Sequence, residues 1–124
     1  MRIFVIIAVM ILAGMVMASA SVYAQDDSVQ FFEVLDDVPL MPGLIELPER
    51  SMSFDKPGGR VVESVAEMAA MSVDSVRAYY ASVLPQFGWN PVGGDQFIRN
   101  GERLEMMFED DAGIIILRLS IQPK

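Results

Sequence analysis

Residues 72–89 carry the clearest helical pattern that follows the N-terminal apolar run of the chain. Apolar side chains recur there at steps of three and four, which places them on one face of an α-helix. They are Val73, Val76, Tyr80, Val83, Leu84 and Phe87. The hydroxyl of Ser72 can cap the first turn, and Gly88 can end the helix in the left-handed conformation. The pattern therefore predicts one amphipathic helix.

Pro85 conflicts with this pattern, because proline lacks a backbone donor and disfavours helical geometry at Leu84. Either the last turn is bent, or the helix stops near Val83 and a turn carries the following aromatic residues inward. In both cases we expect the large aromatic side chains to form the centre of the core. These are Tyr80, Phe87 and Trp89.

Residues 1–24 have the three parts of a secretory signal peptide. Arg2 supplies the positive charge, residues 3–18 are apolar, and small residues follow up to Ala24. This pattern predicts cleavage before Gln25, with the Ala-Ser-Ala sequence at 18–20 as a second candidate. An uncleaved membrane anchor is the competing interpretation, because the apolar run is near the short limit for crossing a bilayer.

The chain contains no cysteine, so it has neither a lipidation cysteine after the signal nor a disulfide framework. Together with the predicted signal, this favours a periplasmic or secreted bacterial protein. The chain has 17 acidic and nine basic residues and a net charge of −8. Such a charge argues against nucleic acids and anionic membrane surfaces as partners. Membrane attachment is expected only if the signal is not cleaved.

Residues 25–43 are expected to form an irregular segment, since Pro39, Pro42 and Gly43 oppose regular structure. The segment is nevertheless too apolar for a linker. Its apolar residues include Phe31, Phe32, Val34 and Leu35. It either docks on the rest of the protein or awaits a partner. Residues 44–124 are expected to form a single domain, which is long enough to enclose one core.

Two stretches before the helix are expected to be strands. Residues 44–54 alternate weakly, and Pro48 places any pairing before it at a sheet edge. Residues 60–70 mix valines, which favour strands, with residues that favour helices. A turn at 55–59, where Pro-Gly suits type II geometry, makes a hairpin strand the preferred interpretation.

Three further strands are expected after the helix. Asn-Gly at 100–101 is a favoured two-residue hairpin turn, and it places Phe97 opposite Leu104 and Arg99 opposite Glu102. For the last hairpin, a four-residue loop at 110–113 satisfies apolar and charged pairs together. It pairs Phe108 with Ile115, Met106 with Leu117, Leu104 with Leu119, and Glu105 with Arg118.

The expected fold is α+β, with an antiparallel sheet of about five strands in the order β-β-α-β-β-β. One apolar face of this sheet packs on the helix, and the other face carries the charges. Three apolar residues share that charged face, namely Met107, Ile114 and Ile116. We expect them either to lie under the N-terminal segment or to form a contact surface.

Residue types that commonly carry catalysis or bind metals are scarce. The chain has no histidine, which together with the lack of cysteine removes the commonest general base, the thiol nucleophile and the usual zinc ligands. The glycine pairs at 58–59 and 93–94 lack the context of a phosphate loop. The adjacent aspartates lack calcium-site spacing. We therefore expect no enzyme activity, no cofactor and no metal site, although a carboxylate-only hydrolase is conceivable.

The capped start at Ser72, the helix end at Gly88-Trp89 and the Arg-Asn-Gly-Glu hairpin at 99–102 resemble a class of small exported bacterial domains. In that class a helix that ends in Gly-Trp precedes a β-meander. The resemblance covers the chain from about Arg50 to the C-terminus. It implies the fold and no activity.

Two functions are compatible with these features. The first is a non-enzymatic accessory protein of the bacterial envelope that binds another protein, through Met107, Ile114 and Ile116 or through a sheet edge. The alternative is a small-ligand-binding domain with a pocket between helix and sheet near Tyr79, Tyr80 and Trp89.

Overall fold

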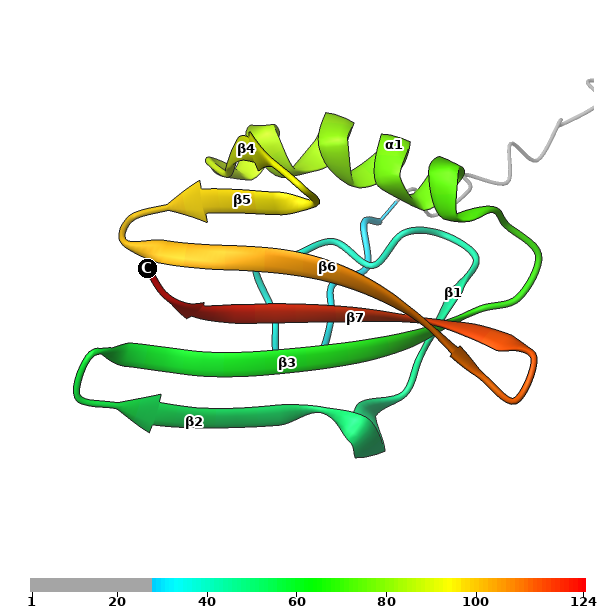
Figure 1. Ribbon diagram of the computed structural model, residues 1–124, viewed down its shortest axis with the longest axis horizontal. Coiled ribbons are helices and arrows are strands. Elements are labelled where there is room, and N and C mark those ends of the chain that lie inside the picture. Colours follow the sequence, from blue (N-terminus) through cyan, green and yellow to red (C-terminus); the bar gives the residue numbers. More distant parts are fainter. Residues whose placement is uncertain (1–27) are drawn as a thin grey trace, which may run out of the picture.

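The computed structural model describes residues 28–124, which form one antiparallel sheet with one α-helix (Figure 1). The elements in chain order are β1 (Leu44–Glu46), the 3₁₀ helix η1 (Pro48–Arg50), β2 (Met52–Lys56), β3 (Gly59–Met68), α1 (Val73–Val83), the 3₁₀ helix η2 (Leu84–Phe87), β4 (Asn90–Gly93), β5 (Gln96–Arg99), β6 (Glu102–Asp111) and β7 (Ile114–Pro123). The strands lie in the order β1-β3-β7-β6-β5-β4, and β2 shares with β1 the outer side of β3. The predicted signal peptide falls outside the described residues.

This architecture agrees with the predicted α+β class, but the prediction of about five strands was too low. Seven strands are present. The 3₁₀ turn that begins at Pro48 divides the expected strand 44–54 into β1 and β2. The short strand β4, which contains Pro91, was not expected at all. The ambiguous stretch 60–70 is a strand over most of its length, as preferred.

Helix α1 begins as predicted and stops where the proline requires. Ser72 caps it, since its hydroxyl oxygen accepts a hydrogen bond of 3.1 Å from the Ser75 N–H. Pro85 lies in the first turn of η2, where a backbone N–H has no partner within the helix. Its lack of an N–H therefore costs no helical hydrogen bond. The structure therefore selects the alternative in which the α-helix ends at Val83.

The C-terminal cap follows η2. Gly88 has a φ of 88°, and the Trp89 N–H donates to the Leu84 carbonyl at 3.2 Å. A second bond of 3.1 Å joins the Gly88 N–H to the Pro85 carbonyl. These two bonds define a Schellman cap, and they turn the Trp89 side chain into the core.

The β5–β6 hairpin has the predicted register, but the predicted β6–β7 register is wrong by two residues. Phe108 lies opposite Leu117, and Glu105 lies opposite Ser120. The reason is the turn: only Ala112 and Gly113 form it, with φ values of 54° and 88°, so both strands are longer than expected. A shift of two residues leaves every side chain on its predicted face.

The core lies between the sheet and two covering elements. One is α1, which runs along β4 and β5, and the other is the segment 28–43, which crosses β6, β7 and β3 (Figure 1). From this segment Phe32, Leu35 and Val38 are buried in the same cluster as Tyr80 and Trp89. The segment is therefore docked rather than left free. Phe87 was expected at the centre, but it is only partly buried and lies edge-on to Phe31, with ring centroids 5.9 Å apart.

The hydroxyl of Tyr80 joins the two covering elements. It donates a 2.7 Å hydrogen bond to the Pro39 carbonyl and accepts a 3.2 Å bond from the Met41 N–H. Burial raises the pKa of Tyr80 well above its usual value, so the hydroxyl keeps its proton. A polar group inside the core is thereby satisfied by the segment that covers it.

We predict that Gly88→Ala lowers the free energy of unfolding by about 1–2 kcal/mol, because an L-residue is strained in the left-handed region. The new Cβ would also lie 3.3 Å from Cδ of Arg99. Gly58→Ala is the matched control, since its φ is not positive and no heavy atom lies within 4 Å of the added Cβ. Denaturant unfolding followed by Trp89 fluorescence measures both, and an equal loss in the two variants would contradict the prediction.

Candidate protein-binding site

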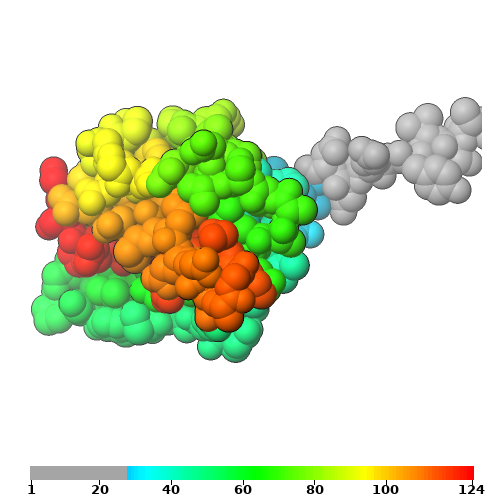
Figure 2. Space-filling model, turned by 45° about the vertical axis from the view of Figure 1, so that its right-hand side comes forward, coloured from blue at the N-terminus to red at the C-terminus, as the bar shows by residue number. Residues whose placement is uncertain are grey.

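The sheet face opposite α1 and the segment 28–43 is called the outer face here. Alternation along the strands assigns residues to it, because neighbours in a strand point to opposite sides. In β6 the core residues are Leu104 and Met106, and in β7 they are Leu117 and Leu119. The outer face is therefore formed by the intervening residues of β6 and β7. The residues that pair with these in β3 and β5 belong to it, and so do the residues of β1 and β2 that pair with the outer-face residues of β3. Figure 2 shows the β6–β7 hairpin, in orange, between α1 above and β2 and β3 below.

Four large apolar side chains of the outer face are strongly exposed. They are Ile45 (51% exposed), Met52 (44%), Phe54 (43%) and Ile114 (43%), and we call them the apolar rim. The first three lie on β1 and β2 along one edge of the sheet. Seven large apolar residues of residues 28–124 are exposed by 39% or more, and four of the seven lie on the outer face. Such a concentration is typical of a contact surface.

The three apolar residues predicted for this face lie on it but differ in exposure. Ile114 belongs to the apolar rim, Met107 is partly buried, and Ile116 is only 3% exposed. The segment 28–43 is on the other side of the sheet and does not cover them. Arg50, which ends η1, makes a 3.0 Å ion pair with Asp111, the last residue of β6, which lies opposite Ile114.

Charged residues occupy the middle of the outer face. Arg118 on β7 pairs with Glu63 on β3 and, at 3.1 Å, with Glu109 on β6. Because of the register shift, these two replace the predicted partner Glu105. Within the described residues, Glu105 and Glu67 are carboxylates of this face without an ion pair. The face therefore combines an apolar rim with excess negative charge.

Tyr79 and Trp89, expected to share a ligand pocket, lie in different environments. Trp89 is fully buried in the core. Tyr79 is partly buried and lines a half-open pocket of about 460 Å³ beside the segment 28–43. The other lining residues are Ser28, Val29, Gln30, Leu40, Met41, Pro42, Gly43 and Leu44. This pocket lies between the helix and the N-terminal segment, not between the helix and the sheet, and its lining has no charged side chain.

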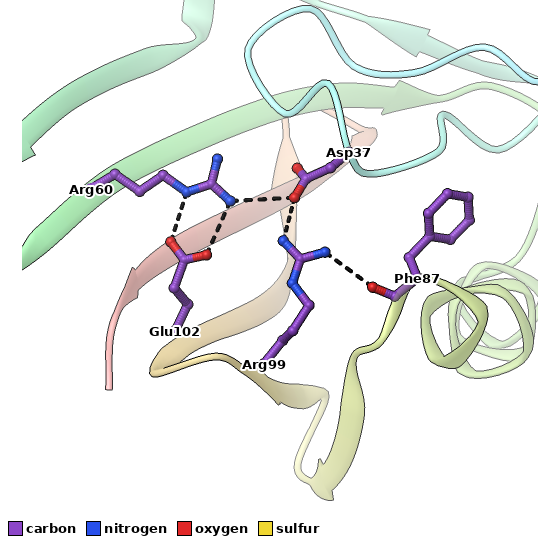
Figure 3. Close-up of polar contacts among 5 residues, drawn as sticks. All are labelled: Asp37, Arg60, Phe87, Arg99 and Glu102. Carbon is purple, nitrogen blue, oxygen red and sulfur yellow. Dashed lines mark hydrogen bonds and ion pairs between the residues drawn. The ribbon is translucent and has the colours of Figure 1, made fainter.

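An ion-pair network fastens the segment 28–43 to the sheet (Figure 3). Arg99, at the end of β5, donates to Asp37 and, at 3.1 Å, to the Phe87 carbonyl. Arg60, at the start of β3, donates to Asp37 at 3.4 Å and to Glu102 at 2.7 Å and 3.1 Å. The guanidinium of Arg99 also lies 4.2 Å from the centre of the Trp89 ring, a cation–π contact.

Asp37 is held ionised by this network. Burial opposes the charge, but the hydrogen bond from Arg99 and the positive charges of Arg99 and Arg60 outweigh that effect and lower the pKa of Asp37. No sequence motif marks the network, because its members are distant in the chain. Each of its charges has a partner within the protein, so the arrangement fits a structural role better than ligand binding.

Two further properties of the described residues bear on function. Within residues 28–124 no helix is long and apolar enough to span a membrane. In the same part of the chain, acidic side chains do not gather into a group that could hold a metal ion. Comparison with protein-family models, with curated proteins and with solved structures finds no match for this chain.

We predict that Asp37→Asn lowers the free energy of unfolding by about 1–2 kcal/mol at pH 7, the range of a charge-assisted hydrogen bond that is partly exposed to water. Because the folded-state pKa of Asp37 is lowered, its contribution is complete above the unfolded value of about 3.9 and is lost as pH falls through the folded value.

The difference between wild type and Asp37→Asn should therefore shrink toward zero below about pH 4. Urea unfolding from pH 7 to pH 3 measures it. Asp36→Asn is the matched control, since Asp36 is exposed and makes no ion pair within the described residues. A difference between wild type and Asp37→Asn that is independent of pH would show that the charge of Asp37 contributes nothing.

Proposed function

We propose that this protein is a non-enzymatic, exported accessory protein of the bacterial envelope that binds another protein through its outer face. The observation that carries the proposal is the apolar rim, because a monomeric protein rarely gathers exposed apolar side chains on one open face without a partner. The predicted signal peptide supports the location. The acidic charge of the chain, −8, favours a partner with a basic surface.

The residues available to the partner differ from those expected at first. Ile116 is buried beneath neighbouring side chains, so a charge placed there would destabilise the fold rather than test binding. Ile114 and Ile45 are exposed and reach the surface from different strands. They are the positions at which binding can be separated from folding.

We predict that Ile114→Lys and Ile45→Lys each reduce the capture of a specific partner at least tenfold. The full chain, expressed with a C-terminal tag so that any processing can occur, is immobilised and exposed to an envelope extract. Retained proteins are quantified by mass spectrometry. Val92→Lys is the matched control, because Val92 is equally exposed (56%) but lies on β4, at the opposite edge of the sheet.

Circular dichroism confirms that each variant is folded before capture is compared. Equal capture by all three variants, or no specific partner at high bait density, would remove the case for the outer face.

A second candidate is the binding of a small uncharged ligand, favoured by the pocket beside Tyr79. A ligand that binds there should raise the melting temperature of wild type and have a smaller effect on Tyr79→Ala, which removes one wall of the pocket. A thermal-shift screen of uncharged compounds tests this. A shift that is the same in both proteins would place the ligand elsewhere.

A further inference from the structure

The two edges of the sheet differ in their capacity to accept another strand. The β4 edge is blunted, since Pro91 has no N–H and the pairing of β4 is interrupted between Pro91 and Gly93. Strand β2 contains no proline, and all five of its residues are exposed. Its only described neighbour is β3. The backbone of β2 is thus open on one side.

The register shows which backbone groups of β2 are free. Lys56 lies opposite Gly59 across a two-residue turn, and the pair that closes such a turn is hydrogen-bonded. Alternation then directs the backbone N–H and C=O groups of Phe54 and Met52 toward β3, and those of Ser53 and Asp55 away from it. The part of β3 that pairs with β1 shows the same alternation. There the Leu47 N–H donates to the Val65 carbonyl, so the backbone groups of Val65 point toward this edge of the sheet, as those of Gly59 do.

The side chains of β2 also alternate in chemistry. Met52 and Phe54 face the outer side and belong to the apolar rim, whereas Ser53 and Asp55 face the other side. Asp55 makes no ion pair among the described residues. Asp55 lies opposite Arg60, whose guanidinium pairs with Glu102 and Asp37 instead. A strand laid beside β2 would therefore meet Met52 and Phe54 on one face, with the Lys56 ammonium 5.8 Å from the centre of the Phe54 ring, and the Asp55 carboxylate, which has no ion pair, on the other.

We propose that the β2 edge takes up an extended segment of a partner protein as an additional strand. Its apolar residues lie beside Met52 and Phe54, and its lysines or arginines alternate with them and face Asp55. The segment bonds to the N–H and C=O groups of Ser53 and Asp55, which gives two donors and two acceptors. This inference rests on the proposed function and adds the binding mode and the chemistry of the partner.

The probe is an eight-residue peptide of alternating valine and lysine, acetylated and amidated at its ends. Titration into the ¹⁵N-labelled protein should shift the amide signals of Ser53 and Asp55 in a saturable manner. A peptide with glutamate in place of lysine should bind at least tenfold more weakly, because it meets Asp55 with like charge. Shifts confined to other strands, or equal binding of both peptides, would overturn the proposal.

Backbone methylation of the peptide provides the sharper control. Residues directly opposite each other in antiparallel strands share a face, so the lysines lie opposite Ser53 and Asp55 and donate their N–H groups to β2. Methylation of the lysine nitrogens should abolish binding, whereas methylation of the valine nitrogens, which point to solvent, should leave it within threefold. The reverse order, or no difference, would exclude strand addition.

Ser53→Pro tests the protein side. It removes an N–H that points outward and spares the bonds to β3, so the variant should fold and bind the lysine peptide at least tenfold more weakly. Ser53→Thr keeps the N–H and should bind within twofold of wild type. If Ser53→Pro does not fold, the methylated peptides still decide the question. Binding that Ser53→Pro leaves unchanged would overturn the proposal.

The same measurements separate the possible outcomes. If the peptide does not bind but Ile114→Lys still loses the captured protein, strand addition is wrong and the proposed function stands. If the peptide binds at β2 and the capture is unaffected by Ile114→Lys, the edge is a binding site and the outer face is not. If the protein is a dimer by sedimentation and Ser53→Pro makes it monomeric, a second copy occupies β2 and the proposal fails.

Discussion

The length of the strands is the constraint on which the rest of this structure depends. Strands β3, β6 and β7 have ten residues each and span about 33 Å, whereas the eleven residues of α1 span about 16 Å. One helix can therefore cover only part of one face. The segment 28–43 covers the remainder, which is why Phe32, Leu35 and Val38 are as deeply buried as the helix residues. The described chain has no further element for the outer face.

Two covering elements on one face must also be held together, and Arg99 does this at the sheet end. Its guanidinium contacts the Trp89 ring, the Phe87 carbonyl and the Asp37 carboxylate, which belong to the core, to η2 and to the segment 28–43. Tyr80 makes the corresponding link further along the helix through its hydroxyl. Directional bonds of this kind select one packing arrangement among several that hydrophobic burial alone would allow.

The features that were predictable are those fixed within a few residues. The Ser72 cap, the Gly88 helix end and the Asn-Gly turn each depend on one local conformation, and all three are present. The β6–β7 register was not predictable, because a shift of two residues keeps the same faces and only the positive φ of Ala112 decides between the alternatives. The Asp37 network and the burial of Ile116 depend on side chains far apart in sequence, and no pattern in the chain marks them.

An uncovered sheet face risks unspecific association, and the arrangement of its side chains limits that risk. The ion pairs of Arg118 with Glu63 and Glu109 link β3, β7 and β6 across the middle of the outer face, so charge rather than apolar surface is presented there. At the edges, proline and a bulge close β4, while β2 remains open next to the apolar rim. A partner that only buries apolar area has little to gain at the charged centre. A partner that pairs with backbone and charge along β2 gains most, and this difference is the physical basis for selectivity.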